Sequence, residues 1–148
     1  MNKFLQVDAQ SFLDFYDKCT PEIRESMKPL FGPQIVEYLC FKIKSYEDAS
    51  KYLYGKVLDL NNLDLKSQVF TKLTTITNAL NDGWDKSKSA VYYYPTFTIT
   101  DGMFEFKDVK QGGYSNIHPF SNPFKFRDAA LAKYAADNFL NLWRAFYV

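Results

Sequence analysis

The sequence predicts an α+β fold with N-terminal helices, a three-stranded antiparallel β-meander and a long C-terminal helix packed on the sheet. Three observations lead to this prediction. Apolar residues recur at helical spacing as far as Leu80, alternate with other residues between Tyr92 and Lys107, and return to helical spacing after Asp128. The 148 residues contain no internal repeat and no linker, so we expect a single globular domain over residues 1–148.

Two helices are predicted at the start of the chain. Asp8 is a suitable cap for the first, and Thr20-Pro21 begins the second, because proline at the first helical position loses no intrahelical hydrogen bond. Pro29 and Gly32-Pro33 are expected to end the second helix. Their apolar faces are predicted to be Phe12, Phe15, Tyr16 and Cys19, and then Ile23, Met27, Leu30 and Phe31.

Residues 34–44 allow two interpretations. Val36, Leu39, Cys40 and Ile43 fit a helix, whereas Phe41-Lys42-Ile43-Lys44 alternates like a strand.

Two further helices have clear boundaries. Ser45-Tyr46-Glu47-Asp48 has the form of a capping box, and Gly55 ends the helix that follows. The next helix begins after Asp64 and ends at Asp82-Gly83, where a left-handed conformation is favoured. Its predicted core face is Leu65, Val69, Leu73, Ile76 and Leu80.

The sheet is predicted from alternation. In the first strand Tyr93, Pro95, Phe97 and Ile99 would face the core, and Tyr92, Tyr94, Thr96 and Thr98 would face outward. Asp101-Gly102 predicts a hairpin turn, because both residues tolerate positive φ. Phe104 and Phe106 continue the core face, and Phe124-Lys125-Phe126 is the expected third strand. The final helix, from Asp128, would present Leu131, Ala135, Phe139, Leu142 and Phe146 as one stripe.

Composition excludes several classes of function. The net charge of +1 gives no long-range field toward nucleic acid or anionic lipid. The N-terminus has no signal-peptide pattern, and no stretch is long and apolar enough for a membrane span, so we expect neither secretion by a signal peptide nor a membrane. Cys19 and Cys40 lie far apart without a Cys-x-x-Cys pair and are expected to be buried, reduced thiols.

The sequence has few motifs that indicate catalysis, cofactor binding or metal binding. His118 is the only histidine and is predicted in the polar loop 111–123, where a solvated role fits better than catalysis. The near pairs of carboxylates are explained by caps, turns and helix ends, although a hydrolase remains an open alternative. No phosphate-binding glycine motif or metal-ligand spacing occurs, so we expect no cofactor and no metal.

The most informative candidate surface is the outer face of the predicted meander. It would carry two tyrosines and three basic residues, namely Tyr92, Tyr94, Lys107, Lys125 and Arg127, if the strands pair in sequence order. Such a surface suits a protein interface or single-stranded nucleic acid, and a covering helix would give it a purely structural role. The near-neutral charge favours protein over nucleic acid.

Four stretches resemble a known family. They are Lys44-Ser45-Tyr46-Glu47-Asp48-Ala49, Thr77-Asn78-Ala79-Leu80-Asn81-Asp82-Gly83-Trp84, Tyr93-Tyr94-Pro95-Thr96-Phe97, and Phe126 followed by Leu131-Ala132-Lys133-Tyr134-Ala135 and Phe139. Over nearly the whole chain, and most specifically from Ser45 to Val148, the sequence resembles small uncharacterised proteins of Bacteroidales bacteria and their phages and prophages, crAss-like phages included. The resemblance implies a phage-associated origin and supplies no catalytic residue.

These observations together predict a non-enzymatic, phage-associated protein that contacts another protein or itself. It would be a small virion component or a host-directed effector, located in the host cytoplasm or in a phage particle. The alternatives are a single-stranded nucleic-acid-binding protein that uses the same aromatic and basic face, and a small hydrolase-like enzyme.

Overall fold

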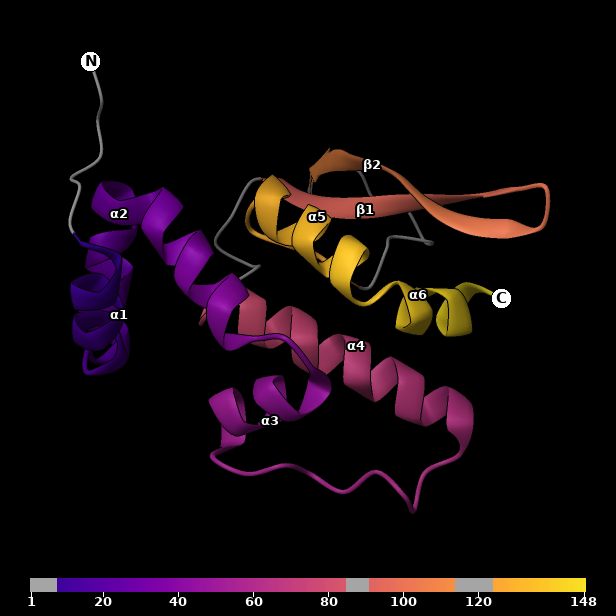
Figure 1. Cartoon of the computed structure of the whole chain (residues 1–148), viewed down its shortest axis with the longest axis horizontal. Coiled ribbons are helices and arrows are strands. Elements are labelled where there is room, and N and C mark those ends of the chain that lie inside the picture. Colours follow the sequence, from indigo (N-terminus) through magenta and orange to yellow (C-terminus); the bar gives the residue numbers. More distant parts are fainter. Residues whose placement is uncertain (1–7, 85–90, 114–123) are drawn as a thin grey trace.

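The computed structural model describes residues 8–84, 91–113 and 124–148, and it joins helices to a small antiparallel sheet (Figure 1). The α+β class is therefore confirmed. The elements are α1 (Ala9–Asp17), α2 (Pro21–Lys42), α3 (Tyr46–Tyr54), α4 (Leu65–Asn81), β1 (Val91–Thr100), β2 (Met103–Gly113), α5 (Ala129–Asn138) and α6 (Leu140–Tyr147).

Helix α2 is longer than predicted. Its start after the Thr20 cap is confirmed, but Pro29 and Pro33 lie inside it, so the expected end there is wrong. The chain bends instead at Phe31, whose φ of −126° and ψ of 31° are not helical. This kink lies between Pro33 and the carbonyl of Pro29, the group with which the Pro33 ring would clash in a straight helix. Residues 34–42 are helical, which decides between the two interpretations of that stretch.

The boundaries of α3 and α4 are confirmed. The hydroxyl of Ser45 accepts a hydrogen bond from the Asp48 N–H at 3.0 Å, and Gly55 ends α3 with a φ of 75°. Helix α4 ends at Asp82 and Gly83, with φ of 46° and 81°.

Strands β1 and β2 form an antiparallel hairpin. Asp101 and Gly102 have φ of 53° and 80°, as the predicted tight turn requires. Phe97 pairs with Phe106, but Thr96 pairs with Asp108, so Lys107 is the extra residue of a β-bulge.

The third strand of the predicted meander is not confirmed, because the sheet of the described residues has two strands. Phe126 makes a single bridge, with two backbone hydrogen bonds of 2.8 Å to Tyr93 of β1, whereas a meander would place it beside β2. On its other side the backbone bonds to a side chain rather than to a strand. Asn81 donates to the carbonyl of Lys125 and accepts from the N–H of Arg127, at 2.8 and 3.0 Å. This amide binds the backbone groups that point away from β1.

The predicted long C-terminal helix is two helices. It is interrupted at Phe139, whose φ is −125° and ψ is 31°, so that α5 lies under the hairpin and α6 continues below its outer end (Figure 1). The indole N–H of Trp143 in α6 donates to the carbonyl of Ala135 in α5 at 3.1 Å. This hydrogen bond links the two helices across the break.

The core lies where α2, α4, α5 and α6 meet the hairpin. Its fully buried members include Ile35, Leu39, Leu73, Ile76, Leu80, Phe124, Phe126, Leu131 and Trp143. Several side chains predicted to face this core are instead exposed: Phe15, Ile23, Leu30, Leu65 and Ile99. Leu65 is the first residue of α4 and Ile99 lies near the hairpin turn, so neither is covered by a neighbouring element. In the described ranges, no helix has the length and apolar character needed to cross a membrane.

Candidate functional site

Tyr92 and Tyr94, two members of the predicted outer surface, lie side by side with ring centroids 6.0 Å apart. Tyr92 is only 8% exposed. Its ring covers Gly112, its partner in the strand register, so closely that a Cβ on this glycine would lie 2.5 Å from Cζ of the tyrosine. The ammonium group of Lys125 is 4.7 Å from the centroid of the same ring. Tyr92 is therefore a packing residue of the hairpin.

The remaining members of the predicted surface are spread out. Lys107 is the exposed bulge residue of β2. Arg127 lies close enough to Tyr16, a buried tyrosine of α1, for its charge to act on the pKa of that phenol. The structure thus brings Tyr92, Tyr94 and Lys125 together and places Arg127 near a different group of residues.

The open part of the outer face belongs mainly to β2. Glu105, Asp108 and Lys110 are exposed there, and Lys110 is opposite Tyr94 in the register. The hydroxyl of Thr96 donates to both the carbonyl and the carboxylate of Asp108.

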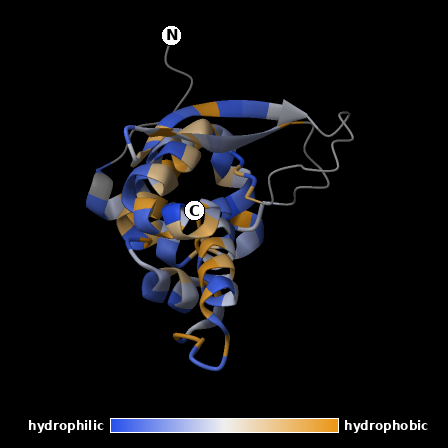
Figure 2. Cartoon of the chain, turned by 90° about the vertical axis from the view of Figure 1, so that its right-hand side faces the viewer, coloured by the Kyte–Doolittle hydropathy of each residue, from blue (hydrophilic) through white to orange (hydrophobic). Residues whose placement is uncertain are grey.

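An apolar groove runs along β1, near the outer end of the hairpin. It has a volume of about 540 Å³ and is lined by Tyr94, Pro95, Thr96, Phe97, Thr98, Ile99, Phe104 and Tyr147. Ile99 is 62% exposed and Met103, at the turn, 63%. Figure 2 shows this end of the molecule, with the hairpin across the top and the C-terminus of α6 beneath it.

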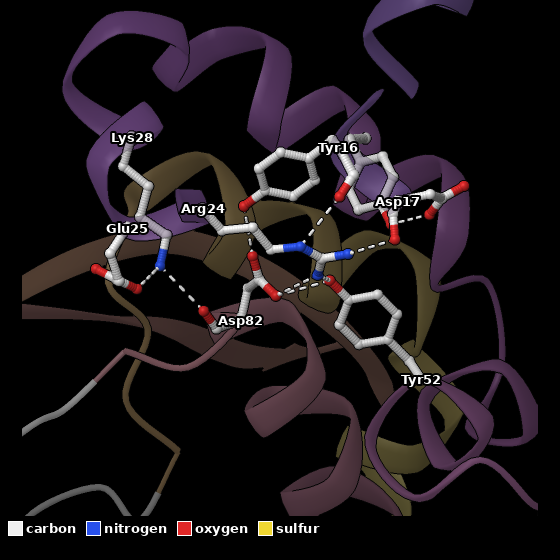
Figure 3. A network of polar contacts seen from close by, with 8 residues as sticks. Tyr16, Asp17, Arg24, Glu25, Lys28, Tyr52 and Asp82 are labelled. Carbon is white, nitrogen blue, oxygen red and sulfur yellow. Dashed lines mark hydrogen bonds and ion pairs between the residues drawn. The ribbon is translucent and has the colours of Figure 1, made fainter. Parts of the chain in front are cut away.

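A polar cluster at the opposite end joins α1, α2, α3 and the end of α4 (Figure 3). The carboxylate of Asp82 accepts from the hydroxyls of Tyr16 at 2.6 Å and Tyr52 at 2.7 Å. The guanidinium of Arg24 contacts the same carboxylate at 3.3 Å and donates to the carbonyl of Tyr16 at 3.1 Å. The rings of Tyr16, Tyr38 and Tyr52 surround this guanidinium, with centroids 4.6, 5.8 and 5.7 Å away.

Two more ion pairs border the cluster. Asp17 accepts from the hydroxyl of Tyr38 and pairs with Lys42 at 3.0 Å. Lys28 donates to the carbonyl of Asp82 at 3.0 Å and also to Glu25. The cluster borders a hollow of about 530 Å³.

The electrostatics of this cluster suit a structural role. Burial, followed by the hydrogen bond to Asp82, raises the pKa of Tyr16, and burial with the charge of Asp82 raises that of Tyr52. These phenols stay protonated, so they do not act as bases. Burial alone would raise the pKa of Asp17, but the hydrogen bonds from Tyr38 and Lys42 bring it below its ordinary value. Asp17 is therefore not a proton donor near neutral pH.

The remaining candidates for a reactive centre are the two cysteines, a metal cluster and His118. Cys19 and Cys40 are free thiols, as predicted, but both are only partly buried. Burial, followed by the charges of Asp128 and Glu37, raises the pKa of Cys40 to about 11. Among the residues described, no group of three or more His, Cys, Asp or Glu is placed to hold a metal ion. His118 lies outside the described residues, as does most of the loop predicted at 111–123.

Sequence reasoning missed the polar cluster. Asp82 was predicted to end a helix, which it does, but its partners Tyr16 and Tyr52 precede it by 66 and 30 residues. No local spacing joins such positions.

In comparisons with protein-family models, with curated proteins and with solved structures, no match to this chain is found.

Proposed function

We propose that the protein works by protein–protein contact without catalysing a reaction, and that the hairpin of β1 and β2 is its contact element. The observation that carries the proposal is the outer end of the hairpin, where Ile99, Met103 and Tyr147 expose apolar surface around a groove. Apolar side chains gathered on one surface are typical of sites that bind protein.

The resemblance to phage and prophage proteins extends the proposal. On that basis the protein is a small virion component or a host-directed effector, present in the host cytoplasm or in the phage particle. A virion component would contact other copies or another structural protein, and an effector would contact a host protein.

Single-stranded nucleic acid is the alternative ligand, and two observations weigh against it. Stacking needs aromatic rings with an open face, and Tyr92 is packed against Gly112 and Lys125. The net charge of +1 also provides little attraction for phosphates.

The test is affinity capture of the tagged protein from phage-infected Bacteroidales cells, with and without nuclease, read by mass spectrometry. Ile99→Asp places a charge in the groove, and Phe15→Asp is a matched control on α1, at the far end of the molecule from the hairpin turn (Figure 1). We expect the parent chain and the control to capture one protein both with and without nuclease. We expect Ile99→Asp to lose that protein.

Two outcomes would contradict the proposal. Equal capture by both variants would remove the hairpin groove as the contact. Bound material that disappears with nuclease would favour the nucleic-acid alternative. Circular dichroism of both variants would establish that a lost contact is not caused by unfolding.

A further inference from the structure

Strand β2 has an edge with no neighbouring strand in the described part of the chain. It pairs along its length with β1, and the sheet contains no further strand beside it. Backbone N–H and C=O groups along such an edge are a template for pairing with another strand.

We propose that two copies of this chain form a symmetric dimer in which β2 of one copy pairs antiparallel with β2 of the other. The two-fold axis would pass between Lys107 and Asp108. A residue a given number of positions before this axis in one copy would then lie opposite the residue the same number of positions after it in the other copy. This inference rests on the proposed function, because it names a second copy as a partner of the same hairpin.

The first support is charge complementarity on the outer face. In this register Glu105 of each copy lies opposite Lys110 of the other, which gives two cross-strand ion pairs. At the axis, Lys107 lies opposite Asp108. Glu105, Lys107 and Lys110 are exposed, and none of them forms an ion pair with another described residue.

The second support is the bulge. Residues directly opposite each other in antiparallel strands must lie on the same face, and an unbroken β2 would place Glu105 and Lys110 on different faces. Because Lys107 is an extra residue, Glu105 and Lys110 both share the outer face, opposite Thr98 and Tyr94 of β1.

The bulge aligns the core face as well. Phe106 and Val109 both face the core, opposite Phe97 and Pro95 in the register with β1. In the proposed dimer Phe106 of one copy lies opposite Val109 of the other. The same register therefore matches charges on one face and apolar side chains on the other.

Neighbouring registers are less favourable. A shift by two residues in one direction brings Glu105 opposite Asp108, and a shift in the other direction brings Lys107 opposite Lys110. Like charges directly opposite each other are destabilising. Charged side chains and a bulge on an edge strand also oppose its pairing with strands of other proteins. The pattern on β2 therefore favours a second copy of this chain in one register.

The test is sedimentation velocity of the purified chain over a range of concentrations, with reciprocal charge reversal. We expect the parent chain to dimerise. Glu105→Lys and Lys110→Glu should each weaken the dimer by about tenfold or more, because either one replaces both attractive pairs with repulsive ones. The two variants mixed together should dimerise again, as should the double variant, because both combinations restore opposite charges. Lys56→Glu, an exposed reversal away from the hairpin, is the control.

A parent chain that stays monomeric throughout would overturn the dimer, as would a dimer that neither reversal weakens or that mixing does not restore. Such failures leave the proposed function separately testable, because capture that depends on Ile99 requires no β2 pairing.

Discussion

Tyr92 lies over Gly112 on the outer face of the hairpin, and the contact leaves no space for a side chain on the glycine. We predict that Gly112→Ala lowers the free energy of unfolding by about 1–3 kcal/mol, because the new methyl group must displace the ring. Glycine weakens a strand, so strand propensity alone would make the alanine variant more stable, and a loss would come from the contact with the ring. The free energies of unfolding are measured by urea denaturation.

A double-mutant cycle separates this contact from other effects. In a Tyr92→Ala background, Gly112→Ala should cost much less, because the obstructing ring is gone. An equal loss in both backgrounds would show that the ring does not fill the space above Gly112.

Asp17 gives stability a predictable dependence on pH. Its pKa is lower in the folded chain than in the unfolded chain, where it is about 3.9, so the folded state binds the proton less tightly. Its stabilising contribution is complete above that pH and is lost as the pH falls through the lower folded-state pKa. We predict that Asp17→Asn flattens the decline in stability below about pH 4.

The measurement is the free energy of unfolding of both chains from pH 7 to pH 2. Asp64 also has a lowered pKa, through hydrogen bonds at its helix cap, so the informative quantity is the difference between parent and variant. Parallel curves would mean that Asp17 is not held by Tyr38 and Lys42.

Individual residues also show how far sequence could predict the candidate sites. Tyr92 and Tyr94 were correctly assigned to one face, because alternation in a strand is a local property. That Tyr92 would be covered was not predictable, since the covering depends on Gly112 in the next strand and on Lys125 after it. The bulge at Lys107 has a local sign, because Val109 follows Phe106 by three residues instead of two, but the predicted alternation ended at Lys107 and did not include it.

At the scale of elements, local sequence signals predicted where a helix begins and ends more accurately than whether a helix continues or breaks along its length. Ser45, Asp64 and Gly55 act through backbone groups within a few residues, and the structure confirms each as a helix boundary. Two helices differ from the prediction, at Pro33, where α2 bends and continues, and at Phe139, where the last helix breaks. A proline ring accounts for the bend at Pro33 but does not show whether the helix resumes beyond it. No glycine or proline marks the break at Phe139.

The third predicted strand failed for a related reason. Phe124 and Phe126 alternate with Lys125 as strand residues do, and both rings are buried as expected. However, Phe126 pairs with β1 at a single position, and the amide of Asn81 from α4 binds the backbone groups that point away from β1. Alternation thus predicted which side chains are buried but not which groups bond to the backbone.

Helix α4 allows a direct test of its predicted register. Leu73 is 1% exposed and Leu65, on the same helix, is 78% exposed. We predict that Leu73→Ala lowers the free energy of unfolding by about 2–5 kcal/mol, because it leaves a cavity in the core. Leu65→Ala should change it by no more than about 0.5 kcal/mol. Similar losses in the two variants, measured in urea, would contradict the burial of Leu73 and the exposure of Leu65.

At the scale of the whole molecule, the polar cluster and the apolar core connect the same elements from two sides. Asp82 at the end of α4 binds residues of α1, α2 and α3, while α4 itself packs against α3, α5 and α6. The N-terminal helices α1, α2 and α3 are therefore joined by both polar and apolar contacts to the layer of α4, α5 and α6 on which the hairpin packs. This arrangement predicts that the chain unfolds as one unit.

Tryptophan fluorescence and circular dichroism together test that prediction. In a Trp84→Phe chain, fluorescence reports only Trp143, which is buried between α6 and the hairpin, while far-ultraviolet circular dichroism reports all helices. We expect the two signals to change at the same urea concentration. Asp82→Asn should move both midpoints down together, with a loss of about 1–3 kcal/mol, because it leaves Arg24 without its ionic partner while asparagine still tolerates the left-handed backbone. If Asp82→Asn instead lowered only the midpoint seen by circular dichroism, α1, α2 and α3 would unfold independently of the layer that holds the hairpin, and the chain would not be a single cooperative domain.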